Sequence, residues 1–436
     1  MRVLVGSILL ATALLGAIGA LVLPLGAAPD ELDHFRVASH IAGVGTLPDP
    51  ATSGMIQAQH PPLGYLTLAG VMRLGLRASE TWSAPAGEEV LGRIRRDPFD
   101  ETLAEAMEDD RPADVIRAAV QPWEARILLA PVWVLHLMRL AALLAGLLGF
   151  WLLLRLAARL GSAGEDGVSG GRAAVALVGA CLLSPSIVYL CAAISNDAIL
   201  FATATLAAAT ALRAHLREDR RWRTAVLVGG LVGLAFLTKA TALATGAFCG
   251  LLMLETWRRG ETARAVLGRV AAAAAAVLAV AGWAYVRNWR LTGSPKADET
   301  VVGRYPGLAR VDALTLDEAW PLPARLFRSL WDDVYGGRLE NFAPVAIVLG
   351  SLAMTCGLLG AFEALAGLRR AEDRRARFPQ IAALAATVVL AIGLLLHAQR
   401  FQVAQGATSS RRPSRSRSSS RVERRRCSGA ARRRPS

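Results

Sequence analysis

The sequence predicts an all-α polytopic membrane protein with about nine transmembrane helices and two extracytoplasmic segments that carry amphipathic helices. Apolar side chains make up 53% of the 436 residues and charged ones 19%, whereas soluble domains carry about 25% charged residues. The mean hydropathy is +0.38. Apolar runs of about 20 residues, the length that crosses a bilayer as a helix, recur along the chain. This balance excludes an ordinary cytosolic enzyme and a disordered or fibrous chain.

The expected spans follow from the apolar runs, taken in chain order. The first run has only Arg2 ahead of it and is longer than the core of a usual secretory signal, so we interpret it as a retained anchor. Several of the later runs are short or merge with a neighbour. The expected spans are Val3–Pro24, Pro131–Leu154, Ala173–Ala193, Ala198–Leu212, Ala225–Leu237, Thr241–Leu254, Val270–Val286, Phe342–Leu368 and Ile381–Leu396.

Basic residues in the short loops predict the orientation, because lysine and arginine stay on the cytoplasmic side of a membrane. Alternate loops are rich in arginine, whereas Ser195–Asp197 and Thr238–Ala240 contain one basic residue between them. This alternation predicts a cytoplasmic N-terminus in the cell (inner) membrane, with about Leu25–Ala130 and Arg287–Asn341 outside. The loop arginines are Arg155, Arg159, Arg172, Arg213, Arg217, Arg220, Arg221, Arg223, Arg258, Arg259, Arg264, Arg269, Arg369, Arg370, Arg374, Arg375 and Arg377.

The first outer segment is expected to contain helices and a solvated insertion. Apolar residues recur at helical spacing over Leu32–Ala42 and Leu66–Leu74, which predicts helices on the membrane surface with charged faces toward water. The acidic stretch Gly87–Asp114 is interpreted as the insertion. Residues 1–406 form the expected transmembrane domain, and the Arg/Ser-rich tail 407–436 is expected to be disordered.

The net charge and the cysteines exclude several function classes. Eleven arginines and one glutamate in the tail supply +10 of the formal net charge of +14, so the remainder gives no support to a nucleic-acid partner. The five cysteines show no metal-ligand spacing, so neither a zinc site nor a disulfide framework is predicted. Motifs of nucleotide-driven transporters, zinc proteases and serine hydrolases are absent. The cofactor is unknown: no motif indicates a metal, and a divalent-cation requirement stays open.

Two acidic residues follow the first span, and an ionisable residue at membrane depth is a candidate functional group because its burial is unfavourable. Asp30 and Glu31 come directly after Pro29, and His34 lies on the same helical face as both. The acidic pair either caps a helix that begins here or supplies a general base that accepts a proton from an attacking hydroxyl. His34 either orients a carboxylate, binds a phosphate oxygen or is structural.

Cationic residues at the same predicted face are candidate phosphate ligands. Arg287 suits a bidentate grip on a phosphate, and Lys239 supplies a point charge. The alternative for both is that a long cationic side chain reaches from the apolar region to the interface. His60 precedes two prolines in the same outer segment and is a third candidate.

Four further residues are candidate supporting groups. Asn196 and Asp197 either belong to the site or cap the fourth span, since both residue types begin helices well. Asn288 follows Arg287 at the end of the seventh span. Arg139 lies inside the second span and needs a partner there, either an acidic residue or a lipid phosphate.

Five sequence blocks occur in order along the predicted outer face. They read PDELDHF, HPPLGYL, SNDA, LTKATAL and YVRNWRLTGSP and lie at Pro29–Phe35, His60–Leu66, Ser195–Ala198, Leu237–Leu243 and Tyr285–Pro295. With these blocks the chain resembles the GT-C superfamily of membrane glycosyltransferases. It is similar to the branch that contains protein O-mannosyltransferases (glycosyltransferase family 39), the aminoarabinose transferases of lipid A and related uncharacterised bacterial membrane proteins.

The resemblance implies transfer of a sugar from a polyprenyl-phosphate donor to a hydroxyl on the extracytoplasmic face, the acceptor being a lipid, a glycan or a protein. The family's acidic pair falls here on Asp30 and Glu31, with Asp30 favoured as the base and Glu31 supporting it. The donor phosphate would meet Lys239, Arg287 and His60. The implied reaction is a single inverting displacement without a covalent enzyme intermediate.

The family pattern stops near Gln405-Gly406, where many members carry a Gln-Gly-Arg-aromatic block. The switch to Arg/Ser repeats predicts that a reading-frame shift produced the tail and that this copy is truncated and weakly active. Two alternatives stay open, namely a lipid-linked-sugar flippase or other transporter, and a non-catalytic pseudoenzyme. A transporter would also use cations in its spans, but it gives no reason for an acidic pair just outside the membrane.

Overall fold

The computed structural model describes residues 1–22, 30–80, 132–162, 168–297 and 374–400. These residues are mostly helical, and no β-strand occurs among them. The predicted span Phe342–Leu368, the acidic stretch Gly87–Asp114 and the tail 407–436 lie outside the described residues. The elements are α1 (Arg2–Val22), α2 (Glu31–Val44), η1 (Ile56–Gln59), α3 (Leu63–Glu80), α8 (Val132–Gly161), α9 (Val168–Leu182), α10 (Pro185–Ala192), α11 (Asp197–Leu216), α12 (Trp222–Phe236), η2 (Ala240–Ala242), α13 (Leu243–Arg258), α14 (Ala263–Thr292) and α19 (Arg374–Arg400).

Five helical segments within the described ranges are long and apolar enough to cross a membrane, which confirms the predicted membrane class in this coarse form. They correspond to α1, α8, α11, α13 with the turn before it, and α14. A bent pair formed by α9 and α10 would make a sixth span, and two shorter apolar helices cover Trp222–Phe236 and Phe378–Gly393. The total of about nine spans and the assignment of the outer segments stay predictions.

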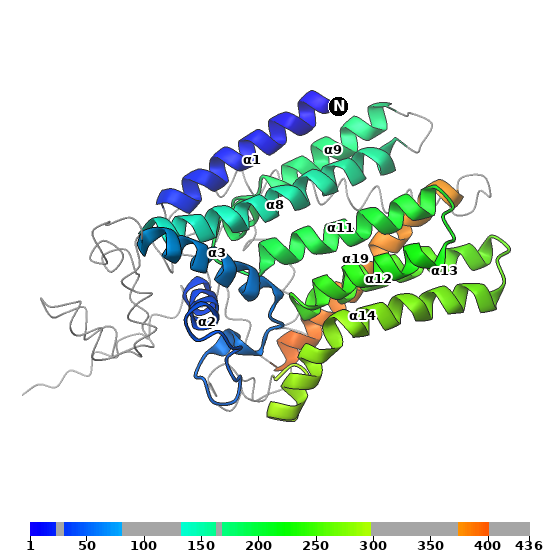
Figure 1. The fold of residues 1–436 in the computed structure, drawn as a ribbon. Helices are drawn as coiled ribbons and strands as arrows, with labels where there is room; N and C mark the ends of the chain where they lie inside the picture. Colours follow the sequence, from blue (N-terminus) through cyan, green and yellow to red (C-terminus); the bar gives the residue numbers. More distant parts are fainter. Residues whose placement is uncertain (23–29, 81–131, 163–167, 298–373, 401–436) are drawn as a thin grey trace, which may run out of the picture.

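The long helices lie side by side and form a bundle with two distinct ends (Figure 1). One end holds the last residues of α8, α11 and α13 and the first residues of α9, α12 and α14; we call it the basic end. The other end holds α2, η1 and α3 and the beginning of α11; we call it the site end. The predicted arginine-rich loops between described helices therefore gather at the basic end, opposite α2 and α3.

Two glycines explain the close packing of α12 along α14. A Cβ atom at Gly229 would collide with the backbone of Ala273, and one at Gly233 would lie 2.8 Å from Cβ of Val280. Small residues four apart let two helix backbones approach closely, which is the main attraction available between helices in lipid. The pairing of these two helices brings the end of α14 to the site end.

The helices α2 and α3 pack on the first half of α8. Phe35 from α2, Tyr65 and Met72 from α3 and Met138 from α8 are buried in one apolar cluster. The helices predicted over Leu32–Ala42 and Leu66–Leu74 are confirmed as α2 and α3. Their mutual burial against α8 provides a rigid support for the residues at the start of α2.

One predicted span is broken in the structure. The sequence indicates a continuous span over Ala173–Ala193, but α9 ends at Leu182 and α10 begins at Pro185, with a bend of 67° between them. Proline lacks the N–H that would continue the helix and its ring clashes with the preceding turn, whereas it fits the first turn of a new helix. The bend directs the chain into the residues Ser195–Asp197 at the site end.

Candidate active site

Asp30 precedes α2 in an unusual backbone conformation. Asp30 is the N-cap residue of α2 with φ 58°, in the left-handed region, and its side chain makes no capping hydrogen bond. Left-handed geometry is uncommon outside glycine and tends to occur at functional sites. Asp30 does lie at the N-cap, but the side-chain hydrogen bond that the capping interpretation expects is absent, so its carboxylate is not used for that bond.

Glu31 occupies a buried ion pair instead of a helix cap. Nε and Nη2 of Arg139 each donate to one oxygen of its carboxylate over 2.8 Å. The Glu31 and Arg139 side chains are only 1% and 4% exposed. The backbone N–H of Ile194 donates a further bond of 3.0 Å to Glu31. Of the two partners that the sequence allowed for Arg139, an acidic residue or a lipid phosphate, the structure shows the acidic residue.

A second ion pair joins the start of α11 to the turn after α12. Nζ of Lys239 donates to Oδ1 of Asp197 over 2.7 Å, and both side chains are partly exposed. Asn196 is fully buried and also makes no capping bond; its amide lies 3.4 Å from the carbonyl of Thr238. A Cβ atom at Gly64 would lie 2.7 Å from Cβ of Asn196, so α3 closes tightly over this junction.

A histidine–tyrosine contact joins α2 to α3 near the Asp197–Lys239 pair. Nδ1 of His34 and the hydroxyl of Tyr65 are 2.8 Å apart, and the rings of His34 and His60 are stacked with centroids 6.5 Å apart. Tyr65 lies in the sequence block that begins at His60, but nothing in the sequence pattern marks it as a site residue. An aromatic residue near a helix start is usually packing, so only its buried hydroxyl identifies it as part of the site.

The electrostatic environment is set by burial and by the Asp197–Lys239 pair. Asp30 is partly accessible to solvent, but loss of solvation raises the pKa of its carboxyl, with Lys239 acting to lower this pKa and Asp197 to raise it. Burial lowers the pKa of His34 to about 4, so this ring is neutral at pH 7. A carboxylate with a raised pKa is a stronger base, which is the property that proton abstraction needs.

Arg287 and Asn288 hold the segment between α2 and α3 against α14. Nη2 of Arg287 donates to the carbonyl of Pro48 over 2.8 Å, and Nδ2 of Asn288 donates to that of Gln59 over 2.7 Å. No contact joins Arg287 to Asp30 within the described part of the chain. Arg287 does share a small pocket with His60 and with the apolar faces of α2 and α14.

The structure brings most of the predicted site residues to one end of the bundle. Asp30, His34, Asp197 and Lys239 interact electrostatically, as do His60 and Asp197. Glu31, the residue after Asp30, is ion-paired with Arg139. Arg287 and Asn288 instead bind backbone carbonyls of the segment between α2 and α3. Among the described residues no group of three His, Cys, Asp or Glu side chains could hold a metal ion.

Comparison of the chain with protein-family models, curated proteins and solved structures finds no match. The resemblance to membrane glycosyltransferases therefore rests on the five sequence blocks alone.

Proposed function

We propose that the chain is a membrane glycosyltransferase that moves a sugar from a polyprenyl-phosphate donor to an acceptor hydroxyl. The observation that carries the proposal is the state of Asp30. Its carboxylate makes no capping bond, its pKa is raised by loss of solvation, and it interacts electrostatically with Lys239. A carboxylate that only began a helix would have no need of these properties.

The proposed reaction is a single displacement. The acceptor oxygen attacks the anomeric carbon of the donor sugar and forms the new C–O bond, while its proton passes to Asp30. The bond between the anomeric carbon and the phosphate oxygen breaks, and the electron pair leaves with the polyprenyl phosphate. The negative charge on the leaving phosphate would meet Lys239, with Arg287 and His60 at the edge of the same region.

Glu31 and His34 act in this proposal as positioning residues. Glu31 is fixed by Arg139 and by the N–H of Ile194, which restrains the neighbouring Asp30. His34 is neutral and bonded to Tyr65, so it adds no charge that would compete with Lys239 for the base. Asn196, Asp197 and Asn288 hold Lys239 and the outer loop in place.

The proposed location is the cell (inner) membrane, with the site end outside and the N-terminus in the cytoplasm. The loops between described helices that are rich in arginine gather at the basic end (Figure 1). Basic loops remain in the cytoplasm during membrane insertion. A site on the opposite end would meet a donor in the outer leaflet and an acceptor outside the cytoplasm.

A reconstituted assay tests the proposal against a transporter. The full chain in phosphatidylcholine vesicles would be given a panel of polyprenyl-phosphate sugars with lipid, glycan and peptide acceptors, and products would be identified by mass spectrometry. The proposal predicts a glycosylated acceptor together with free polyprenyl phosphate. Movement of intact donor between leaflets without any glycosylated product would contradict it and favour a flippase.

A further inference from the structure

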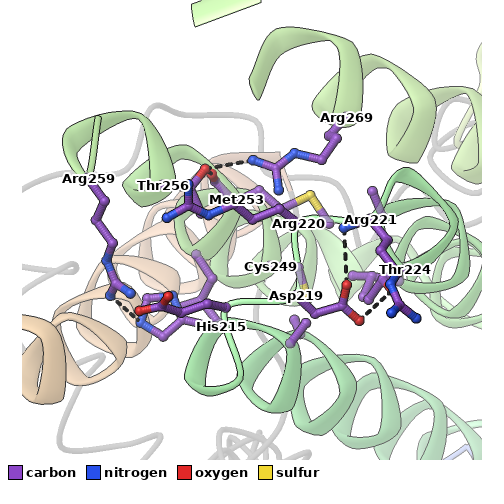
Figure 2. A pocket seen from close by; sticks show the side chains of 16 residues that line it. His215, Asp219, Arg220, Arg221, Thr224, Cys249, Met253, Thr256, Arg259 and Arg269 are labelled. Carbon is purple, nitrogen blue, oxygen red and sulfur yellow. Dashed lines mark hydrogen bonds between the residues drawn. The ribbon is translucent and has the colours of Figure 1, made fainter. Parts of the chain in front are cut away.

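A second pocket lies at the basic end, far from the candidate active site. It is enclosed by the end of α11, the turn before α12, the end of α13 and the start of α14. Its floor is apolar and includes Val228, Cys249, Leu252 and Met253. Polar and charged side chains surround this floor (Figure 2). The arginines that line the pocket are Arg220, Arg221, Arg259 and Arg269.

Two carboxylates beside the pocket are ion-paired with arginines, and Glu218 and Asp219 line it. Oε2 of Glu255 lies 2.5 Å from Nε of Arg259, and Glu261 is paired with Arg269. Asp219 closes the turn before α12, because its oxygens accept from the backbone N–H of Arg221 and from the hydroxyl of Thr224. These hydrogen bonds also lower the pKa of Asp219.

Arginine donors are left over after these pairings. The Arg269 side chain extends from α14 toward Thr256 (Figure 2), and the residue is only 8% exposed. Its Nε–H is buried and has no acceptor among the described residues. Arg220 and Arg221 are exposed at the rim and form no ion pair within those same ranges. Buried polar groups in proteins are nearly always hydrogen-bonded, so this N–H needs an acceptor, and the oxygen of an anion supplies a strong one.

We propose that this pocket binds the phosphate group of an anionic phospholipid. The phosphate oxygens would accept from Nε of Arg269, and Arg220 and Arg221 would balance the charge, while the apolar floor would receive the adjoining part of a lipid chain. Two exposed tryptophans come directly after lining residues in the sequence: Trp222 after Arg221, at 63% exposure, and Trp257 after Thr256, at 59%. Exposed tryptophans beside arginines are typical of the lipid interface, so a lipid phosphate is favoured over a free one. This site is independent of the proposed transferase reaction.

The test compares two matched pairs of substitutions. The full chain would be placed in phosphatidylcholine nanodiscs with a minor share of phosphatidylglycerol, and retained phosphatidylglycerol would be counted by native mass spectrometry. Arg220→Gln with Arg221→Gln removes the rim charges, whereas Arg217→Gln with Arg223→Gln removes the same charge from exposed positions in the same turn that do not line the pocket. We expect about tenfold weaker retention for the first pair and parental retention for the second. An equal loss in both pairs would overturn the pocket assignment.

Two further measurements address the buried donor and the source of the phosphate. Arg269→Lys keeps the charge opposite Glu261 but removes Nε–H, and it should weaken retention severalfold; parental retention would overturn the proposed contact. If this variant does not fold, as judged by thermal unfolding, the rim pairs still decide the proposal. Inorganic phosphate in excess should leave phosphatidylglycerol bound. Displacement of the lipid by inorganic phosphate would show that the pocket takes a free anion.

Discussion

Arg139 and Glu31 lie 108 residues apart in the sequence and meet inside the protein through two hydrogen bonds of 2.8 Å. Glu31 is the first residue of α2, and Asp30 is its immediate neighbour. The same carboxylate also accepts from the backbone N–H of Ile194, next to the polar residues that begin α11. One buried ion pair therefore fixes α2, α8 and the approach to α11 in relation to one another.

Breaking this pair should destabilise the fold strongly. Glu31→Gln or Arg139→Gln alone leaves a buried partner without its counter-charge, and we expect a loss of about 3–5 kcal/mol in the free energy of unfolding. The double variant should lose clearly less than the sum of the two. The control is Asp33→Asn with Arg36→Gln, a partly exposed pair 3.9 Å apart, expected to change stability by less than about 1 kcal/mol. Denaturant unfolding in detergent measures all four, and strictly additive losses would contradict a direct pair.

The rate of sugar transfer should respond to pH through Asp30. The base must be ionised, so the rate falls as pH drops through its pKa, which burial raises above the ordinary 3.8. Lys239→Met removes a charge that lowers this pKa, so the fall in the transfer rate at acidic pH should begin at a higher pH. Asp197→Asn removes a charge that raises the pKa of Asp30, so the same fall in rate should begin at a lower pH. Profiles of transfer rate against pH measure both shifts. Asp33→Asn is the control, and its profile should match the parental one. Shifts in the same direction for Lys239→Met and Asp197→Asn would exclude Asp30 as the titrating group.

Close packing of α12 on α14 gives a prediction with an internal control. Gly229→Ala places a Cβ atom against the backbone of Ala273 and should lower the free energy of unfolding by about 1–3 kcal/mol. Gly230→Ala, one residue on, meets nothing within 4 Å and should be neutral or slightly stabilising, because alanine favours helix over glycine. Thermal unfolding in detergent distinguishes the two, and equal midpoints would show that the helices are not in such close contact.

The orientation of the bundle can be tested by labelling of single cysteines in intact cells. In a chain whose five cysteines are replaced by alanine, Thr52→Cys lies in the exposed loop at the site end and Arg217→Cys at the basic end. A membrane-impermeant maleimide should label position 52 in intact cells and position 217 only after permeabilisation. The reverse pattern would put the proposed site in the cytoplasm.

Much of the helical framework was predictable because apolar length is a local property of the sequence. The predicted spans Ala198–Leu212 and Val270–Val286 fall inside α11 and α14, which extend further at both ends. The extensions carry residues such as Arg269, since helical hydrogen bonding continues past the apolar run. The break before Pro185 was also visible as a proline within an apolar run, but length alone favoured one continuous span.

The partners within the candidate site were not predictable in the same way. The sequence shows that Arg139 needs a counter-charge, but nothing local indicates which residue 108 positions away supplies it. His34 meets Tyr65 through the packing of α2 on α3, and a single sequence contains no signal for that contact. The free carboxylate of Asp30 was likewise hidden, because a residue after proline and before an apolar run is a good helix cap by pattern.

Replacement of Asp30 by asparagine decides whether this carboxylate is the base of the proposed glycosyl transfer. Asp30→Asn keeps the size of the side chain and removes no capping bond, so its thermal unfolding midpoint should stay near the parental value. The rate of transfer from the polyprenyl-phosphate sugar should fall by about 10²–10⁴ while the donor still binds. Asp33→Asn, which removes a carboxylate from the first turn of α2, should transfer at the parental rate. A folded Asp30→Asn variant that transfers sugar as fast as the parent would contradict the account.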